Sequence, residues 1–312
     1  MPFGVSNDRS EACRVPYSCL VTSEISVRPA LPSDHDAIAD FTRDTFEWGD
    51  YIADVFDEWL EREDTRIVVA ESDAHRPIAI GAVRMLSPTE AWYSAARVHP
   101  EFRGRGIAAQ VSRELRQWAR ERGALVGRLL VEDWNEVAIR HVEKTGPRRV
   151  MSVVRCSKPV GDASPSPSGN GGRRLPSKLR ARPAGSSEAQ PAYASWSIGE
   201  LGRASRGLIG IGWTFRRLTL ADLETAARAA SFWEIGAGWA LAAPAPESHF
   251  EVAWLETREE DANDLLRSLV DLAIGSGSES ISIWVPAIDW MVQAARRLGF
   301  ETNLLHVYAR EI

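Results

Sequence analysis

The segment that most constrains the fold is a glycine-rich turn between a strand and a helix, over Val98–Ala109 (VHPEFRGRGIAA). Gly104 and Gly106 allow main-chain conformations with positive φ, and they let N–H groups come close to a ligand. The helix that follows, over Ile107–Arg122, adds unpaired N–H groups and the positive end of its dipole. Two arginines add fixed positive charge: Arg103 and Arg105. The turn therefore predicts an anion site suited to a pyrophosphate.

Two common nucleotide patterns fit this turn poorly. A Walker A loop ends in Gly-Lys-Ser/Thr, and those residues are absent. Gly104-x-Gly106-x-x-Ala109 satisfies a loose dinucleotide pattern, but that pattern opens a βαβ unit and is followed by an acidic residue about 20 positions later. Here several strands come first and the region around Val126 is apolar.

Strands and helices alternate before residue 157. The apolar periodicity and turn residues predict strands over Ile25–Arg28, Arg66–Glu71, Pro77–Leu86, Ala91–Val98, Leu125–Val131 and Arg149–Cys156. They predict helices from an N-cap at Ser33 to about Phe46, and over Val55–Leu60, Ile107–Arg122 and Glu136–Lys144. This order predicts an α/β fold, an α+β mixed sheet flanked by helices.

A similar order returns in the second half of the chain. Strands are expected over Trp213–Leu218, Ile235–Ala243, Phe250–Leu255, Ser280–Val285 and Asn303–Arg310, and helices over Ala221–Ala230, Leu265–Ile274 and Trp290–Leu298. Ala138–Pro147 can also be laid beside Met291–Phe300. We therefore expect one fold to occur twice in tandem.

Composition sets the expected boundaries. Residues 1–23 lack the apolar core of a signal peptide and are expected to form a flexible tail. Residues 158–195 are rich in Pro, Ser, Gly and Arg, which predicts a linker; a polyanion could bind its arginines, although a solvated tether is the simpler interpretation. The two folded units are expected over residues 24–157 and 196–312.

The order Arg103-x-x-Gly106-x-Ala108 after Val98-x-Pro100 resembles the acetyl-CoA loop of the GCN5-related N-acetyltransferases (GNAT). The resemblance covers roughly residues 24–156, and it implies acetyl-CoA as cosubstrate. It implies contacts to the cofactor from Val98, Arg103, Gly104, Arg105, Gly106, Ile107, Ala108 and Asn135. Asn135 also suits a helix N-cap, and the two roles could coincide.

Within that superfamily, the chain loosely resembles the histidine N-acetyltransferase group. The pieces that carry this are Gly49–Ile52, Trp59-Leu60, Arg66–Ala70 and Arg97–Gly106. This resemblance implies the α-amino group of an amino acid, or a similar small amine, as acceptor. Four residues are expected in the wall of the acceptor site, where an ammonium group would suit a carboxylate beside an aromatic ring: Glu47, Trp48, Asp50 and Tyr51.

Amide formation from a thioester needs a base for the amine and an exit for the thiolate. We favour Glu132, at the end of the fifth strand, as base or water-holder; Asp133 and Glu90 are alternatives, and strand-end carboxylates are often only solvated. Val142 occupies the position where many GNAT enzymes have a tyrosine acid. Tyr93 or His141 could substitute for it.

The second half lacks the features of the anion loop. The corresponding stretch, Leu255–Asp264, contains no glycine and four carboxylates that would repel a pyrophosphate: Glu259, Glu260, Asp261 and Asp264. We expect this degenerate unit to bind no CoA, and to buttress the first domain or shape the acceptor pocket.

The bulk composition narrows the function class. A net charge of -6 argues against nucleic acid as partner, and no apolar run is long enough for a membrane span. The three cysteines (Cys13, Cys19 and Cys156) fit no metal site and suggest a cytoplasmic protein. The expected function is acetyl transfer to a small-molecule amine by a monomer or homodimer. The alternatives are a protein or peptide N-acyltransferase and a non-catalytic CoA-binding sensor or scaffold.

Overall fold

The computed structural model of the chain describes residues 25–47, 49–73, 75–160 and 179–312. The expected tail over 1–23 and residues 161–178 of the expected linker lie outside the described residues. The first half contains β1 (Ser26–Pro29), η1 (Pro32–Asp34), α1 (His35–Thr42), α2 (Ile52–Glu61), β2 (Thr65–Glu71), β3 (Pro77–Ser87), β4 (Glu90–Val98), η2 (Pro100–Phe102), α3 (Ile107–Glu121), β5 (Val126–Glu132), α4 (Glu136–Thr145) and β6 (Arg148–Pro159).

The second half has a similar order, with an added hairpin and an added helix before its second sheet strand. It contains β7 (Ala181–Pro183), α5 (Ser186–Ile198), α6 (Glu200–Ala204), β8 (Leu208–Ile211), β9 (Thr214–Arg217), α7 (Leu220–Arg228), β10 (Phe232–Ile235), β11 (Gly238–Ala245), β12 (His249–Glu256), η3 (Glu259–Asp261), α8 (Ala262–Gly275), β13 (Ser280–Pro286), α9 (Asp289–Arg297) and β14 (Glu301–Glu311). The hairpin β8–β9 forms a small sheet of its own.

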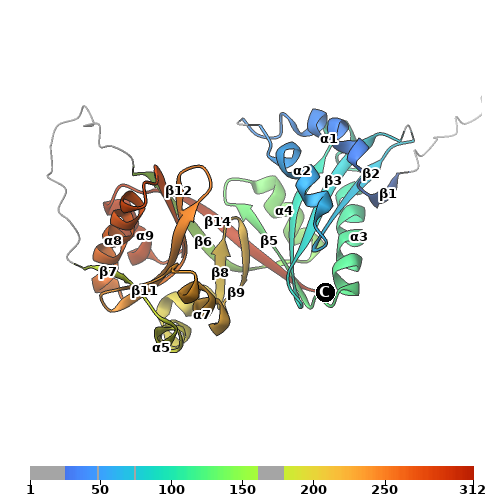
Figure 1. Ribbon diagram of the computed structural model, residues 1–312. Helices are drawn as coiled ribbons and strands as arrows, with labels where there is room; N and C mark the ends of the chain where they lie inside the picture. The colour runs from blue at the N-terminus through green and yellow to red at the C-terminus, as the bar shows by residue number, and fades with distance from the viewer. Residues whose placement is uncertain (1–24, 48, 74, 161–178) are drawn as a thin grey trace, which may run out of the picture.

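The two halves share one mixed sheet. Among the described residues it has 12 strands, in the order β1-β2-β3-β4-β5-β14-β6-β13-β12-β11-β10-β7. The last strand of the chain, β14, thus lies between β5 and β6 of the first half, and β6 lies between β14 and β13 of the second (Figure 1). Each half therefore completes the sheet of the other, and the tandem fold is interlocked.

Helices cover both faces of the sheet. In the first half α1 and α2 pack against one face, with Ile38 and Phe56 fully buried, while α3 packs against the other through Val111 and Leu115. In the second half the helices α5, α8 and α9 share one larger apolar core with β10–β13. The amphipathic stripe expected on α3 is confirmed, since its buried residues follow helical spacing: Ile107, Val111, Leu115, Trp118 and Ala119.

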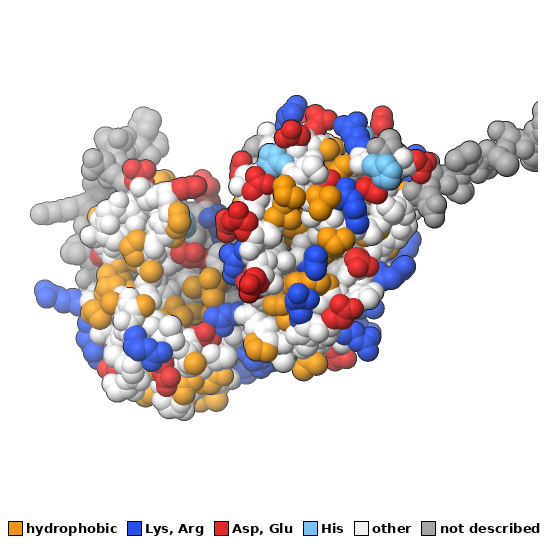
Figure 2. All heavy atoms as spheres, turned by 45° about the vertical axis from the view of Figure 1, so that its right-hand side comes forward, with side chains coloured by type: hydrophobic (Ala, Val, Ile, Leu, Met, Phe, Trp, Pro, Cys, Tyr) orange, Lys and Arg blue, Asp and Glu red, His pale blue; other side chains and the backbone are white. Residues whose placement is uncertain are grey.

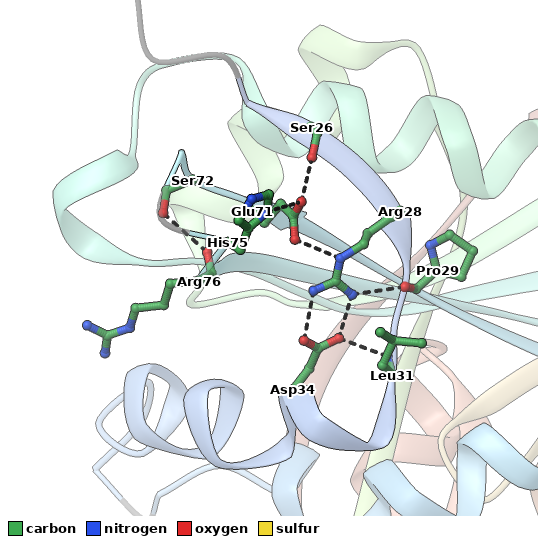
Figure 3. Close-up of polar contacts among 9 residues, drawn as sticks. All are labelled: Ser26, Arg28, Pro29, Leu31, Asp34, Glu71, Ser72, His75 and Arg76. Atoms are coloured by element: carbon green, nitrogen blue, oxygen red, sulfur yellow. Dashed lines mark hydrogen bonds and ion pairs between the residues drawn. The ribbon is translucent and has the colours of Figure 1, made fainter.

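One arginine fastens the outer strand β1 to its surroundings (Figure 3). The Arg28 guanidinium donates to both carboxylate oxygens of Asp34, at 2.7 and 2.9 Å, and its Nε donates to Glu71 Oε2 at 2.7 Å. Asp34 also accepts the main-chain N–H of Leu31 at 2.8 Å. The N-cap expected at Ser33 is therefore wrong, because Ser33 lies inside a 3₁₀ turn and Asp34 precedes α1.

The predicted linker over 158–195 is wrong at both ends. Strand β6 continues to Pro159, and β7 and α5 begin before residue 195. The small and polar residues of α5, together with Pro191 in its interior, hide the helix from sequence patterns. Its buried face consists of Ala189, Ala192 and Trp196, so tertiary packing supplies what composition does not show.

The strand expected over Ile235–Ala243 is in fact two. Phe232–Ile235 and Gly238–Ala245 form an antiparallel hairpin, β10–β11, in which Ile235 pairs with Gly238.

Cys156 is a buried free thiol in the part of the chain that the structure describes, and burial raises its pKa to about 12. Charged side chains of both signs are interspersed over the face shown in Figure 2.

Candidate functional site

The turn between β4 and α3 presents a row of free amides. Gly104 and Gly106 have φ of 78° and 76°, the left-handed region that L-residues rarely adopt. In the described structure no backbone acceptor lies within hydrogen-bonding range of the N–H groups from Gly104 to Ala108. The side chains at 103–106 are exposed, so this row of N–H groups is open to a ligand.

Helix α3 adds to the positive potential at this point. It begins at Ile107 directly after the loop, and no acidic side chain lies in its first turn. Arg103 Nε donates to the carbonyl of Val98 at 3.2 Å, and Arg105 lies over the ring of Phe102 at 4.9 Å. Both guanidinium groups lack a carboxylate partner within the described ranges. This geometry suits an anion, and binding of a pyrophosphate here stays a prediction.

Beside this loop, strand β4 has an unpaired edge. The parallel pairing of β4 with β5 covers only Glu90–Trp92 and Val126–Arg128. The remainder of β4, Tyr93–Val98, still pairs with β3 but with no described strand on its other side. Its free N–H and C=O groups can bind an extended ligand that carries amides, as a further strand would.

A bulge interrupts β4 in the middle of this free edge. The register with β3 shifts between Ile80 and Ala82, and Ala95 has φ of 57° while being buried. A non-glycine residue held at positive φ stores strain of the kind found at functional sites. The hydroxyl of Tyr51 lies beside this point: burial raises its pKa, while Arg97 and the Ala95 amide act in the opposite direction.

Glu132 stands at the end of β5, half-buried. Its Oε1 accepts a hydrogen bond from Asn303 Nδ2 of β14 at 3.3 Å, so the second half holds this carboxylate in place. Alternation along β5 puts Glu132 on the same face as Arg128, which pairs with Trp92. This is the face covered by α1 and α2.

The neighbouring carboxylate, Asp133, has a partner that the sequence did not reveal. Asp133 Oδ1 lies 2.8 Å from Nε2 of the buried His306, whose Nδ1 lies 3.0 Å from Ser152 Oγ. His306 comes from β14, and no local pattern links it to β5. The same strand exchange that brings Asn303 to Glu132 brings His306 to Asp133.

Glu90 is a structural carboxylate. It is buried and forms an ion pair with Arg128 at 2.5 Å, and its Oε1 also accepts the main-chain N–H of Arg217 at 3.2 Å. Its other oxygen, Oε2, accepts the Ser87 hydroxyl at 3.2 Å, and a carboxylate held by three donors inside the protein is poorly placed to take a proton from an amine. Glu90 thereby ties the hairpin β8–β9 of the second half to the start of β4.

The groups considered as general acid differ in their surroundings. Val142 is buried against Val131 and Tyr308, and His141 is exposed. The Tyr93 hydroxyl is buried with no hydrogen-bond partner in the described part of the chain, and burial raises its pKa to about 12. Tyr93 and Tyr51 therefore keep their protons at neutral pH.

The residues expected in the acceptor wall differ in their surroundings. Asp50 is committed to an ion pair with Arg97 at 2.7 Å, so its carboxylate is not free for an ammonium group. Tyr51 packs on Trp59 at 6.2 Å, and Glu47 is exposed. Trp48 lies outside the described residues. Phe46 reaches Trp134, after β5, with ring centroids 6.2 Å apart, so the loop before α2 borders the end of β5.

Asn135 lies at the start of α4. Its Oδ1 accepts the N–H of Ala138 at 3.1 Å, as an N-cap does. The N-cap interpretation is confirmed. A contact of Asn135 with a cofactor stays a prediction.

The second half reproduces the strand geometry without the loop. Strand β12 pairs with β13 in parallel only from His249 to Val252, like β4 with β5. Between β12 and α8 stands the short helix Glu259–Asp261, and this connection has no glycine. Its carboxylates oppose an anion at the start of α8.

A row of free amides at a helix start, beside an unpaired strand edge in a mixed sheet, suits a ligand that carries both a pyrophosphate and amide groups. Residues 35–146 match the family model described as "Acetyltransferase (GNAT) family". The matched segment contains the loop and strand β4, and it is similar to the acetyltransferases of this family.

Solved structures show the same fold over nearly the whole chain. A GCN5-related N-acetyltransferase from Sphaerobacter thermophilus has a TM-score of 0.64 at 16% identity, covering 92% of this chain and 95% of that one. A glucosamine N-acetyltransferase region in a fungal multi-domain β-N-acetylglucosaminidase also has a TM-score of 0.64, at 12% identity, covering 93% of this chain and 38% of that one. The α/β tandem fold is therefore confirmed. No curated protein matches the sequence.

Within the described ranges, no group of three or more His, Cys, Asp and Glu side chains is arranged to hold a metal ion. No helix in the described part of the chain is long and apolar enough to cross a membrane.

Proposed function

We propose that this chain transfers an acetyl group from acetyl-CoA to the primary amine of a small molecule, with the α-amino group of an amino acid as the narrower candidate. The observation that carries the proposal is the row of free amides from Gly104 to Ala108 beside the unpaired edge of β4. These amides, with Arg103 and Arg105, suit a pyrophosphate, and the free edge of β4 suits the amides of a pantetheine arm.

Acetyl-CoA supplies a thioester. The amine nitrogen of the acceptor forms a bond to the carbonyl carbon of this thioester as the carbon–sulfur bond breaks. Glu132 would take the amine proton, directly or through a water molecule. Asn303 would hold the carboxylate in position for that step. The Ala95 bulge leaves main-chain N–H groups of β4 available to stabilise negative charge on the carbonyl oxygen.

The leaving thiolate does not require a proton source, because a thiol with a pKa of about 8–9 leaves readily as its anion. A nearby acid would still assist the step. Tyr51 is the better placed of the two buried tyrosines, since its hydroxyl lies beside the bulge on the face where Glu132 lies. Tyr93 lies over Gly127 on the opposite face.

The test is thiol release from acetyl-CoA against amino acids, polyamines, aminoglycosides and short peptides. We expect release with a small primary amine, histidine being the first to try. Release with peptides alone would replace the small-molecule acceptor by a peptide N-terminus. Measurable CoA binding without release from any acceptor would favour a sensor instead. The connection before α8 supports one CoA per chain, and calorimetry that finds two would contradict this.

A further inference from the structure

A cavity in the second half lies apart from the acyltransferase site. It measures about 430 Å³ and is bordered by α5, α6 and the end of the hairpin β8–β9. This volume falls in the range of small-molecule sites. The residues that line it include Tyr193, Arg203, Arg206, Gly207 and Arg217.

Three arginines from different parts of the chain meet in this cavity. Arg203 belongs to α6, Arg206 to the turn before β8, and Arg217 to the end of β9. None of them forms an ion pair with a described carboxylate, although Arg216, next in sequence, is paired with Asp222 at 2.7 Å. The lining itself contains no acidic residue. Three guanidinium groups around one hollow create a strongly positive site.

Local geometry holds these groups in the cavity. The Arg203 guanidinium donates to the carbonyl of Ile198 at the end of α5, which fixes its direction. Arg217 Nη1 lies 3.8 Å from the position that a Cβ on Gly207 would take, so this guanidinium group lies beside the turn at Gly207. Arg203 and Arg217 are therefore held in place, and all three arginines are exposed, so their charges are available to a ligand.

Arg206 is the least expected residue at its position. Its φ is 53°, in the left-handed region where glycine is favoured, and Gly207 follows with φ of 75°. The backbone at Arg206 is therefore strained, and strained residues are often found at functional sites.

We propose that this cavity binds a small polyanion bearing phosphate groups. A planar guanidinium group can donate two parallel hydrogen bonds to two oxygens of one phosphate. Three such groups suit a ligand with two or more negative charges. The half-buried Tyr193 provides a flat wall for the rest of such a ligand. The cavity is connected to the first half, because the main-chain N–H of Arg217 binds Glu90 at the start of β4.

The probe is inorganic pyrophosphate, titrated into the full chain by calorimetry. We expect two sites per chain, one of which disappears when CoA is saturating because CoA fills the loop before α3. The other should persist with CoA and weaken at least tenfold in the combined variant Arg203→Gln, Arg206→Gln, Arg217→Gln. The matched control is Arg228→Gln, an exposed arginine of α7 outside the cavity, which should leave both sites intact.

A single change separates ligand binding from folding. Arg206→Gly places the preferred residue at positive φ, so it should keep or raise the melting temperature while it weakens the CoA-resistant site. The proposal is overturned if saturating CoA removes all pyrophosphate binding, if the combined variant binds as the wild type does, or if Arg228→Gln weakens binding equally.

Discussion

The imidazole Nε2 of His306 lies 2.8 Å from Asp133 Oδ1, although 173 residues separate them in sequence. The contact exists because β14 inserts between β5 and β6. On the same strand, Asn303 holds Glu132. The end of β5, where acyl transfer is proposed, is thus built jointly by both halves.

Replacing His306 by Ala should lower the free energy of unfolding by about 1–3 kcal/mol. The imidazole is buried, and its loss leaves Ser152 without the partner at 3.0 Å. Urea unfolding measures the change. His141→Ala, an exposed histidine on α4, is the matched control and should change stability by less than about 0.5 kcal/mol. Equal effects of the two changes would mean that the strand contact contributes nothing specific.

Glu132→Gln should lower kcat for acetyl transfer by about 100-fold, because a general base contributes roughly 10²–10⁴-fold. The KM for acetyl-CoA should stay unchanged, since Glu132 lies outside the amide loop. Glu136→Gln removes a nearby exposed carboxylate and is the control. A fall in kcat of only a few-fold would assign Glu132 to solvation and exclude it as base.

Gly106→Leu should weaken CoA binding at least tenfold. No atom lies within 4 Å of the Cβ that it would gain, so the change causes no packing clash, but φ of 76° strains any L-residue. We therefore also expect a loss of about 1–2 kcal/mol in stability. Gly275→Leu, at the end of α8 with equally open space, should alter neither quantity much. Unchanged CoA affinity in Gly106→Leu would show that the cofactor loop is elsewhere.

The Arg28 network predicts acid sensitivity. Hydrogen bonding to Arg28 lowers the pKa of Glu71 from 4.5 to about 2. A carboxyl with a depressed folded-state pKa contributes stability that is complete above pH 4.5 and is lost as pH falls toward about 2. Glu71→Gln should flatten the decline of the melting temperature in that window, whereas Glu61→Gln, at the exposed end of α2, should not. A parallel decline in all three proteins would contradict the assignment.

Local sequence patterns predicted much of this molecule and missed specific parts. The periodicity of Ile107–Glu121 and the glycines before it are local signals, so α3 and its loop follow from the sequence. Helix α5 has no such pattern, because it consists mostly of small and polar residues and contains Pro191. Its buried face, which includes Trp196, is recognised only from the packing in the structure. The exchange of β6 and β14 depends on pairing between distant strands. Asn303 and His306 therefore could not be associated with β5 in advance.

The interlocked sheet predicts that the first half does not fold alone. Strand β6 pairs only with β14 and β13 in the described sheet, and both come from the second half. A chain ending at residue 160 would lose every partner of β6 and expose the edge of β5. We expect it to aggregate, or to melt without cooperativity by circular dichroism.

The control divides the chain at the same residue but keeps both parts. Residues 1–160 and 161–312, expressed together as two chains, keep all the described strand pairs. They should co-elute as a one-to-one complex with a cooperative transition, because the backbone hydrogen bonds of β6 do not require a covalent connection between the halves. A monomeric, cooperatively melting first half would show that β6 can pair with β5 directly. In that case the exchange would add stability to a domain that is already complete, and Glu132 would not need Asn303 to be held at the site.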